Sequence, residues 1–572
     1  MNRKQRHCRQ LLAVTPHHAD SLHFPGIAVP QSGRSDLAVC PIGKAPIHSS
    51  RTGKALDEEL PPLAVRVLSE AWGRTGSLTR VGVDLVKFDS SVAECLARAV
   101  EAWPNPLPSR ILFGTSGLAA ITANPLLSVL LDAGPICDVE MERFLTTARR
   151  ALLDSVGDGS GSADRVRFYS ALARQCFINE YVYCVTADEE RRADDLRDRL
   201  AAALAADSPV PVSWLMAVAA YFPLHSLHLA GRILERSWPE EIEALLTQQI
   251  RAPAEELRIA ASIPQLISIE DDVSRLVRHQ HEENPHSRWV KAPRPRKANS
   301  VLAYLRRTFS PASFDRSSDG EPGGDVEILV AGCGTGQHSI RTAQQFPTAR
   351  ILAIDLSRSR LAQAARRTRE LGISSIEYVQ ADLLQLDSLD RRFDAIEAGG
   401  ALHHLADPWT GWRSLLSLLR PGGFMLVGIY SATAWRHVVR ARALITERGH
   451  GATTDGIRRG RQALLEQSSG SSASGELPSD LFTLSGCRDV LFHVQERYVT
   501  LTEIETFLEK NNLTFLGFEM SADVRQAYRT HFPDDLAATN LSQWQVFESL
   551  NPDAFAGMYQ FWIQKNDSAD LG

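Results

Sequence analysis

The sequence predicts an α/β domain built around a seven-stranded sheet and, before it, an all-α helical domain. Three observations support this prediction. The residue pattern is persistently helical over residues 60–269. A strand, a glycine turn, a helix and a second strand follow within residues 326–355. Further strand and helix patterns then extend to about residue 567, as in a sheet that helices cover on both faces.

Residues 1–55 resemble a single degenerate tetratricopeptide unit. Leu22 and Gly26 stand as in such a helix pair, but Pro25 and Pro30 fall inside the expected helices. An internal proline removes a hydrogen-bond donor and costs about 3 kcal/mol. We therefore predict a partly unstructured arm, with a peptide-binding repeat array as the alternative.

Residues 56–285 are predicted to form the all-α domain. After Asp138, which can cap a helix, apolar residues recur at helix spacing until Gly157. Two polar groups are predicted to be structural rather than catalytic or metal-binding: Asn179-Glu180-Tyr181, and the pair His225 and His228. The domain therefore shows no catalytic constellation.

Residues 286–325 are predicted to be a solvated linker. Pro293 and Pro295 break helices, and basic residues are frequent from Arg288 to Lys297. Contact of this basic run with an acidic substrate is the alternative. A short helix at residues 301–309 then leads into the α/β domain.

Residues 326–355 are the centre of the α/β domain. Two apolar runs, 326–330 and 350–354, enclose a turn with a glycine at every second position. These glycines are Gly332, Gly334 and Gly336. Because glycine has no side chain, the backbone of such a turn can approach a ligand at the carboxyl end of the strand. The stretch predicts a pocket for a nucleoside cofactor.

The glycine spacing argues against a dinucleotide. The dinucleotide fingerprint is G-x-G-x-x-G, and Gln337 occupies the position of its third glycine. A nicotinamide-dependent oxidoreductase remains an alternative. Asp355, at the end of the second strand, can accept hydrogen bonds from both hydroxyls of a ribose. Asp382 follows a third strand near residues 377–380, and with Leu383 beside it suits an adenine ring and its amino group.

The later elements continue the α/β pattern. The fourth strand is predicted at residues 393–398 and the fifth at 424–430, with a helix and the turn Pro421-Gly422-Gly423 between them. A long helix is expected from Ala432 to about Glu466, before a flexible Ser/Gly-rich loop. Residues 432–500 would form an inserted lid. A capped helix and two strands close the domain, at residues 500–513, 513–519 and 557–565.

Over roughly residues 326–430 the chain resembles class I S-adenosylmethionine-dependent methyltransferases. Five motifs occur in the order typical of that family: AGCGTG, the acid of LAIDLS, the QADL turn, FDAIEAGGALHHL and LLRPGGFMLVGIY. The resemblance implies a Rossmann-like fold, S-adenosyl-L-methionine as the cofactor, and methyl transfer. The three glycines would line the methionine and ribose portions of the cofactor. Asp355 would bind the ribose, and Asp382 would bind the adenine. The implied cofactor-binding residues are Gly332, Cys333, Gly334, Gly336, Asp355, Leu356, Asp382, Leu383 and Gly399.

A more particular resemblance is to a bacterial group of tetratricopeptide-repeat methyltransferases of unassigned substrate. The segments RQCFINEY, QHEENPHSRW, SGCRDVLFHVQERYVT and AGMYQFWIQK carry it. The helical half would then recognise the methyl acceptor, a peptide, a protein or a small metabolite. In that group tyrosines and a proline stand where this chain has His281, His286 and Ser287. This departure leaves a second reading open, a non-catalytic nucleoside-binding adaptor or degraded pseudo-enzyme whose helices bind a protein partner.

Methyl transfer from a sulfonium is an in-line displacement in which the protein mainly aligns the reactants and excludes water. A base is needed where the acceptor atom carries a proton at neutral pH. In this fold the exit of the fourth strand faces the methyl group, so His403 and His404 are the first candidates for the base. They are expected to point opposite ways. His493 is the second candidate and Tyr430 the third. No set of metal ligands is apparent, and no metal is predicted.

Composition sets further limits. The 572 residues carry a formal net charge of −6, which argues against nucleic acid as a partner. The eight cysteines form no C-x-x-C pair, so neither a zinc ribbon nor a disulfide scaffold is predicted. No apolar run reaches the length of a membrane span, and the first residues lack the apolar core of a secretory signal. A cytoplasmic protein without membrane contact is expected.

Overall fold

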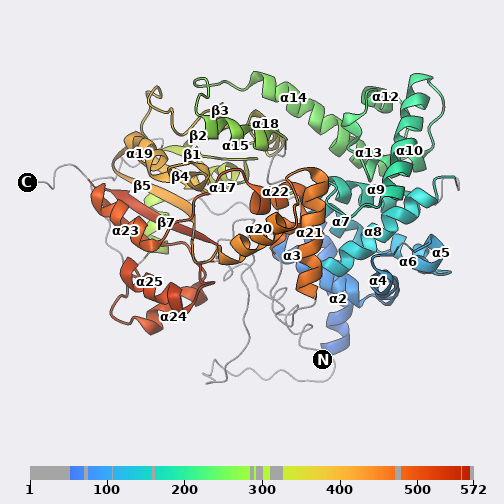
Figure 1. Cartoon of the computed structure of the whole chain (residues 1–572), viewed down its shortest axis with the longest axis horizontal. Coiled ribbons are helices and arrows are strands. Elements are labelled where there is room, and N and C mark those ends of the chain that lie inside the picture. The colour runs from blue at the N-terminus through green and yellow to red at the C-terminus, as the bar shows by residue number, and fades with distance from the viewer. Residues whose placement is uncertain are drawn as a thin grey trace, which may run out of the picture. The chain divides into compact units, whose positions relative to one another are not determined.

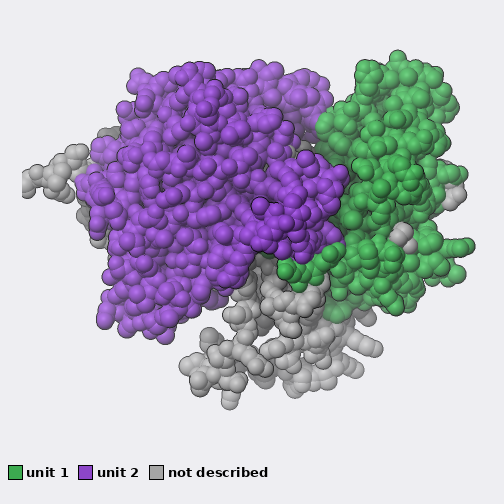
Figure 2. Space-filling view, viewed as in Figure 1, with its two compact units in different colours: residues 1–13, 28–250, 465–483 green, residues 14–27, 251–464, 484–572 purple. Residues whose placement is uncertain are grey.

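The computed structural model describes residues 52–69, 75–105, 107–157, 162–283, 289–291, 300–309, 326–469, 478–555 and 557–566. These residues form two compact units, coloured separately in Figure 2. Unit 1 contains the described residues up to Ile250 together with those of 465–483, and unit 2 contains the described residues of 251–464 and 484–566. The expected boundaries differ, because the helices that follow Ile250 belong to the unit that holds the sheet.

Unit 1 is helical, as predicted. Its helices are α2 (Thr52–Ser69), α3 (Thr75–Phe88), α4 (Ser90–Ala102), α5 (Ser109–Phe113), α6 (Gly117–Thr122), α7 (Pro125–Ala133), α8 (Val139–Asp154), α9 (Ala163–Ile178), α10 (Ala187–Ala205), α11 (Val212–Ala219), α12 (Ala230–Leu234) and α13 (Glu240–Leu246). Short turns are η1 (Leu224–Ser226) and η5 (Ser479–Phe482), and the π-helical η2 (Thr247–Arg251) follows α13.

Helix α8 shows how the sequence pattern determines these elements. The Asp138 carboxylate accepts a hydrogen bond from the backbone N–H of Met141 at 2.8 Å and caps the first turn, as expected. The apolar residues at helix spacing, such as Phe144 and Leu152, are buried in the core of the unit. The helix ends at Asp154, three residues before Gly157.

Unit 2 is a Rossmann-like α/β domain with a seven-stranded mixed sheet, which confirms the predicted fold (Figure 1). The strands are β1 (Glu327–Ala331), β2 (Arg350–Asp355), β3 (Ile376–Gln380), β4 (Phe393–Gly399), β5 (Leu419–Tyr430), β6 (Leu513–Phe518) and β7 (Met558–Lys565). Their order is β3-β2-β1-β4-β5-β7-β6. The first five are parallel, and β7 runs antiparallel between β5 and β6.

Both faces of the sheet are buried. Along β1, Leu329 packs in one hydrophobic cluster and Val330 in a second cluster. Two-sided burial explains why the central strands are continuous apolar runs. Helices α17 (Gln337–Gln345) and α18 (Arg358–Glu370) pack against β2 and β3, and α19 (Pro408–Leu418) packs against β5. The turns that follow the parallel strands therefore emerge together at one edge.

The remaining helical elements of unit 2 are α14 (Ala252–Ser262), α15 (Asp272–Glu283), α16 (Val301–Thr308), η4 (Leu402–His404), α20 (Arg436–Glu447), α21 (Thr454–Ser469), α22 (Leu484–Phe492), α23 (Leu501–Lys510), α24 (Ala522–His531) and α25 (Leu541–Leu550). The capped helix is confirmed in α23, whose Thr500 and Glu503 form a capping box. Helices α24 and α25 were not predicted.

Two expectations about this region were wrong. The long helix expected to begin at Ala432 is two helices, α20 and α21, because Gly449 adopts a φ of +70° just after α20. Strand β5 begins at Leu419, so the Pro421-Gly422-Gly423 segment lies inside the strand rather than before it. The predicted lid region thus consists of α20, α21, η5 and α22.

Trp289, in the basic segment predicted to be solvated, is only 9% exposed. The short helix predicted at residues 301–309 is α16, which buries Val301 and Leu305. Most of the predicted arm, the Ser/Gly-rich stretch at 470–477, His286 and Ser287 lie outside the described residues. Among the described helices, none combines the length and the apolar character that a membrane crossing requires.

Candidate active site

The turn between β1 and α17 holds the three predicted glycines. Gly332, Gly334 and Gly336 have φ angles of +70°, +55° and +91°, in the region that favours glycine. A Cβ atom at Gly332 would lie 2.5 Å from the Cβ of Ala401, so the turn lies close against the loop after β4. The Cys333 side chain packs in the core, where burial raises the pKa of its thiol well above the usual value. Only the backbone of Cys333 lines the turn.

We expect Gly336→Ala to destabilise unit 2 by about 2–4 kcal/mol. The added Cβ would lie 2.5 Å from the Cβ of Ala364 on α18, at a residue whose φ is already positive. Gly372→Ala is the matched control, because Gly372 has a φ of +66° but no atom within 4 Å of the Cβ position. The control should cost about 1 kcal/mol. Urea unfolding measures both costs, and equal values would contradict the importance of the contact with α18.

Asp355 ends β2, and its carboxylate faces the glycine turn. Oδ2 accepts a hydrogen bond from the backbone N–H of Gly334 at 2.9 Å, and Oδ1 accepts one from the backbone N–H of Ser357 at 2.9 Å. Each carboxylate oxygen can accept a further hydrogen bond, so Asp355 retains capacity for two ribose hydroxyls. Leu356 follows, and its carbonyl accepts a hydrogen bond from Nε2 of Gln380 at 2.8 Å, which ties the ends of β2 and β3 together.

Asp382 lies in the turn after β3. Gln380, two residues before Asp382, pairs with Asp355 in the strand register, so the two acids lie at the ends of adjacent strands. Oδ1 of Asp382 accepts a hydrogen bond from the backbone N–H of Leu384 at 3.0 Å, whereas the buried Oδ2 has no hydrogen-bond partner within the described residues. A buried acceptor without a donor is costly. The amino group of an adenine would satisfy it, and Leu383 packs in the core beside it.

Gly399 completes the row of predicted cofactor residues. It ends β4 and pairs with Gly428 of β5. The predicted residues follow β3, β2, β1 and β4, which are neighbours in that order. The carboxyl ends of adjacent parallel strands meet at one edge of a sheet. The structure therefore brings these residues together in an arrangement that fits an adenosyl group.

Three contacts around this edge were not predicted. The Trp289 indole N–H donates a hydrogen bond to the carbonyl of Thr335, in the glycine turn, at 3.0 Å. Residues 264–266 pair with the end of β3. The Glu282 carboxylate accepts a hydrogen bond at 2.6 Å from the backbone N–H of Arg358, the first residue of α18. These residues precede the sheet in the chain, and no local pattern places them against it; Glu282 and Trp289 belong to the QHEENPHSRW segment, which carried a resemblance but no assigned contact.

His403 lies in η4, directly after β4. Its ring stacks on Tyr430 of β5, with the ring centroids 3.5 Å apart. Burial lowers the pKa of His403 to about 3. An imidazole with so low a pKa is a weak proton acceptor at neutral pH, which disfavours His403 as the base.

The other two candidate histidines, His404 and His493, lie together. Their rings stack with centroids 4.1 Å apart, and burial lowers the pKa of both. The His403 and His404 rings are only 4.3 Å apart, so the expectation that they point opposite ways was wrong. They lie in a 3-10 helix, where successive side chains are about 120° apart.

His281 of α15 extends this group. Its ring lies 5.9 Å from that of His404 and 5.8 Å from that of His493. Glu496 is paired with Arg442 at 2.6 Å, and burial raises the pKa of Glu496 to about 7. The histidine cluster is defined as His281, His404, Asp489, His493 and Glu496. Ligand-type atoms of several members lie within 4.8 Å of one another, contrary to the expectation that no set of metal ligands is present.

Comparison with known proteins finds a similar family profile for part of the chain. Residues 328–423 match the family profile described as Methyltransferase domain. Over 277 residues the chain is 31% identical to an uncharacterized protein of Synechococcus sp., a match that covers 46% of this chain and 66% of that protein. Over 132 residues it is 31% identical to the ubiquinone/menaquinone biosynthesis C-methyltransferase of Klebsiella pneumoniae, covering 23% of this chain and 51% of that enzyme.

Among solved structures, PKMT2 from Rickettsia typhi in complex with AdoHcy is similar, with a TM-score of 0.35 and 16% sequence identity. That match covers 48% of this chain and 55% of the other chain. The matches thus span about half to two-thirds of the length of these three proteins.

Proposed function

We propose that the chain transfers the methyl group of S-adenosyl-L-methionine to a peptide, a protein or a small metabolite, because residues 328–423 match the profile of a methyltransferase domain. The observation that carries the proposal is the pair of acids at adjacent strand ends. Asp355 is hydrogen-bonded to the glycine turn, and Asp382 has a buried oxygen that no described group satisfies. Ribose hydroxyls and an adenine amino group are the donors that such a pair would bind.

The bound cofactor would supply a methyl group already activated on a positively charged sulfur. The residues of the chain would then bind the cofactor and the acceptor, orient them for methyl transfer, and exclude water from the site. Asp355 and Asp382 would fix the adenosyl group, and the glycine turn would leave room for its methionine portion. The stacked rings of His403 and Tyr430 form an apolar wall after β4 and β5, beside the place where the acceptor would approach.

We propose that the mainly helical part of the chain before the sheet recognises the acceptor. In support, Glu282 of α15 and the non-helical residues 264–266 and Trp289 contact the edge of the sheet that carries the cofactor residues. A protein partner that binds unit 1, and a cytoplasmic location, are further parts of the proposal.

Incubation of the full chain with S-adenosyl-L-methionine labelled on its methyl group and with fractionated host extract tests the function. We expect one fraction to take up the label, and Asp382→Asn to reduce the uptake by about 10-fold or more, because it replaces an acceptor oxygen with a donor. Asp387→Ala is the control, since Asp387 is exposed in the same loop.

Two outcomes would contradict the proposal in different ways. Equal transfer by wild type and Asp382→Asn would remove the assigned adenine site. Tight cofactor binding without uptake of label by any fraction would favour the non-catalytic adaptor instead.

A further inference from the structure

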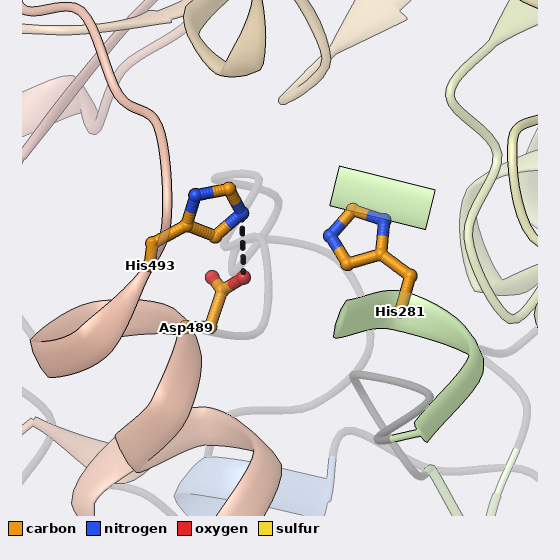
Figure 3. Close-up of side chains that lie close together, drawn as sticks. All are labelled: His281, Asp489 and His493. Carbon is orange, nitrogen blue, oxygen red and sulfur yellow. Dashed lines mark ion pairs between the residues drawn. The ribbon is translucent and has the colours of Figure 1, made fainter. Parts of the chain in front are cut away.

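Two histidines and an aspartate converge in unit 2, outside the row of cofactor residues. His281 is on α15, Asp489 is on α22, and His493 directly follows α22. One ligand-type atom of each lies within 4.8 Å of those of the other two. Figure 3 shows the His493 ring and the Asp489 carboxylate on one segment, and the His281 ring opposite them on another helix.

The local fold explains the convergence. Asp489 and His493 are four residues apart at the end of a helix, a spacing that places both side chains on the same face. Helix α15 supplies the third member from the opposite side. The His493 side chain is fully buried, and that of Asp489 is 13% exposed. His281 is 4% exposed.

The distance between the side chains of His493 and Asp489 fits binding of one ion by both better than a hydrogen bond between them. Nε2 of His493 and Oδ1 of Asp489 are 3.9 Å apart, which is too long for a hydrogen bond. Two ligands on one tetrahedral ion are about 3.4 Å apart when each bond is about 2.1 Å long. A small inward movement of the side chains would therefore complete the geometry.

A second observation points to a missing ligand. Nε2 of His493, Nδ1 of His404 and Oε1 of Glu496 are buried, and no group in the described parts of the chain hydrogen-bonds to them. His404, His493 and Glu496 also have ligand-type atoms within 4.8 Å of one another. Buried polar atoms are normally satisfied, so three such atoms on neighbouring side chains are unusual.

We propose that His281, Asp489 and His493 bind a divalent transition-metal ion of the zinc or iron type. Two imidazoles and one carboxylate are a ligand set of catalytic zinc and of non-haem iron sites, and they leave at least one coordination position open. Magnesium and calcium prefer sites made entirely of oxygen ligands, which this one is not. His404 and Glu496 form a second group with His493, in which one ligand-type atom of each residue lies within 4.8 Å of the others, beside the proposed site.

The position of the ion, beside the loop that follows β4, would let it help to bind the methyl acceptor. His404 belongs to η4, which follows β4, and its ring stacks on that of the proposed ligand His493. The ion would fasten α15 to the end of α22. Its open position would bind an oxygen or nitrogen atom of the acceptor.

Metal binding by the full chain tests the proposal without any need for methyl transfer. The protein is stripped with a chelator, dialysed, and titrated with Zn²⁺ or with Co²⁺ as a spectroscopic probe. We expect one equivalent of metal per chain and the visible absorption bands of four- or five-coordinate Co²⁺. His493→Ala and Asp489→Asn should each weaken binding by about 100-fold or more. His279→Ala is the matched control, because His279 lies on the same helix as His281 with a 73% exposed side chain.

Absence of stoichiometric binding by the folded wild-type protein would overturn the proposal, as would equal affinities of Asp489→Asn and His279→Ala. The wild-type cobalt spectrum and the isosteric Asp489→Asn variant decide the question even if His493→Ala does not fold. Affinity for S-adenosyl-L-methionine is measured on the same samples. A sample that binds the cofactor but no metal would refute the metal site alone, and one that binds metal but no cofactor would refute the proposed function alone.

Discussion

Replacing Asp355 with alanine is expected to weaken binding of S-adenosyl-L-methionine by about 100-fold or more, because two hydrogen bonds from ribose hydroxyls to a carboxylate contribute about 1.5–3 kcal/mol each. The variant also removes the acceptor that holds the backbone N–H of Gly334 at 2.9 Å, so the glycine turn loses a fixed contact. The lost ribose contacts act on the bound state, whereas the lost contact with Gly334 also acts on the free protein. Isothermal titration calorimetry of the full chain measures the loss directly.

Asp387→Ala provides the comparison for this measurement, because it removes an exposed carboxylate from the loop after β3 and leaves the cofactor residues unchanged. Asp355→Asn separates charge from shape, since an amide has one acceptor oxygen where the carboxylate has two. We expect its affinity to lie between those of wild type and Asp355→Ala. Wild-type affinity in Asp355→Ala would refute the assigned ribose site.

The sequence indicated which residues follow the strand ends, because strand ends and glycine turns depend on local chemistry. A glycine turn must follow β1, and a strand end is a short, regular feature, so Asp355 and Asp382 could be assigned from their positions after apolar runs. The parallel topology then brings them together without further information. The same reasoning identified the seven strands, although the place of β7 between β5 and β6 depends on pairing that no local pattern encodes.

The histidine cluster could not be predicted in the same way. His281 precedes the sheet, His404 follows β4, and His493 follows α22, so their proximity depends on the tertiary fold. The sequence indicated His404 and His493 only as separate candidates for a base, and His281 only as a departure from a family pattern. The burial of Trp289 also depends on the tertiary fold, because its indole N–H donates a hydrogen bond to the glycine turn, 46 residues further along the chain.

The second large effect is expected in unit 1, where Glu189→Gln should destabilise the protein by about 3–5 kcal/mol, since it leaves buried cations without their counter-charge. Glu189 is 4% exposed on α10. Its carboxylate pairs with Arg149 at 3.0 Å and with Arg150 at 2.8 Å, and it accepts a hydrogen bond from the Tyr221 hydroxyl at 2.5 Å. The side chain of Arg149 is only 1% exposed, so water cannot replace the lost charge.

Glu190→Gln is the control, because Glu190 is the exposed neighbour on the same helix. Urea unfolding followed by hydrogen exchange in peptides from α8 and α10 assigns the loss to unit 1. Equal stability of the two variants would contradict the importance of the buried pairs.

The stabilisation by Glu189 should also depend on pH. Burial by itself would raise the pKa of Glu189, but the nearby Arg149 and Arg150 outweigh it and lower the pKa below its usual value of 4.5. A carboxyl group whose pKa is lower in the folded state stabilises the protein fully above the pKa of the unfolded chain, and this contribution disappears as the pH falls through the folded pKa. The difference in unfolding free energy between wild type and Glu189→Gln should therefore be constant near neutrality and shrink below about pH 4.5. A difference that grew on acidification would mean that Glu189 is not held ionised by its arginines.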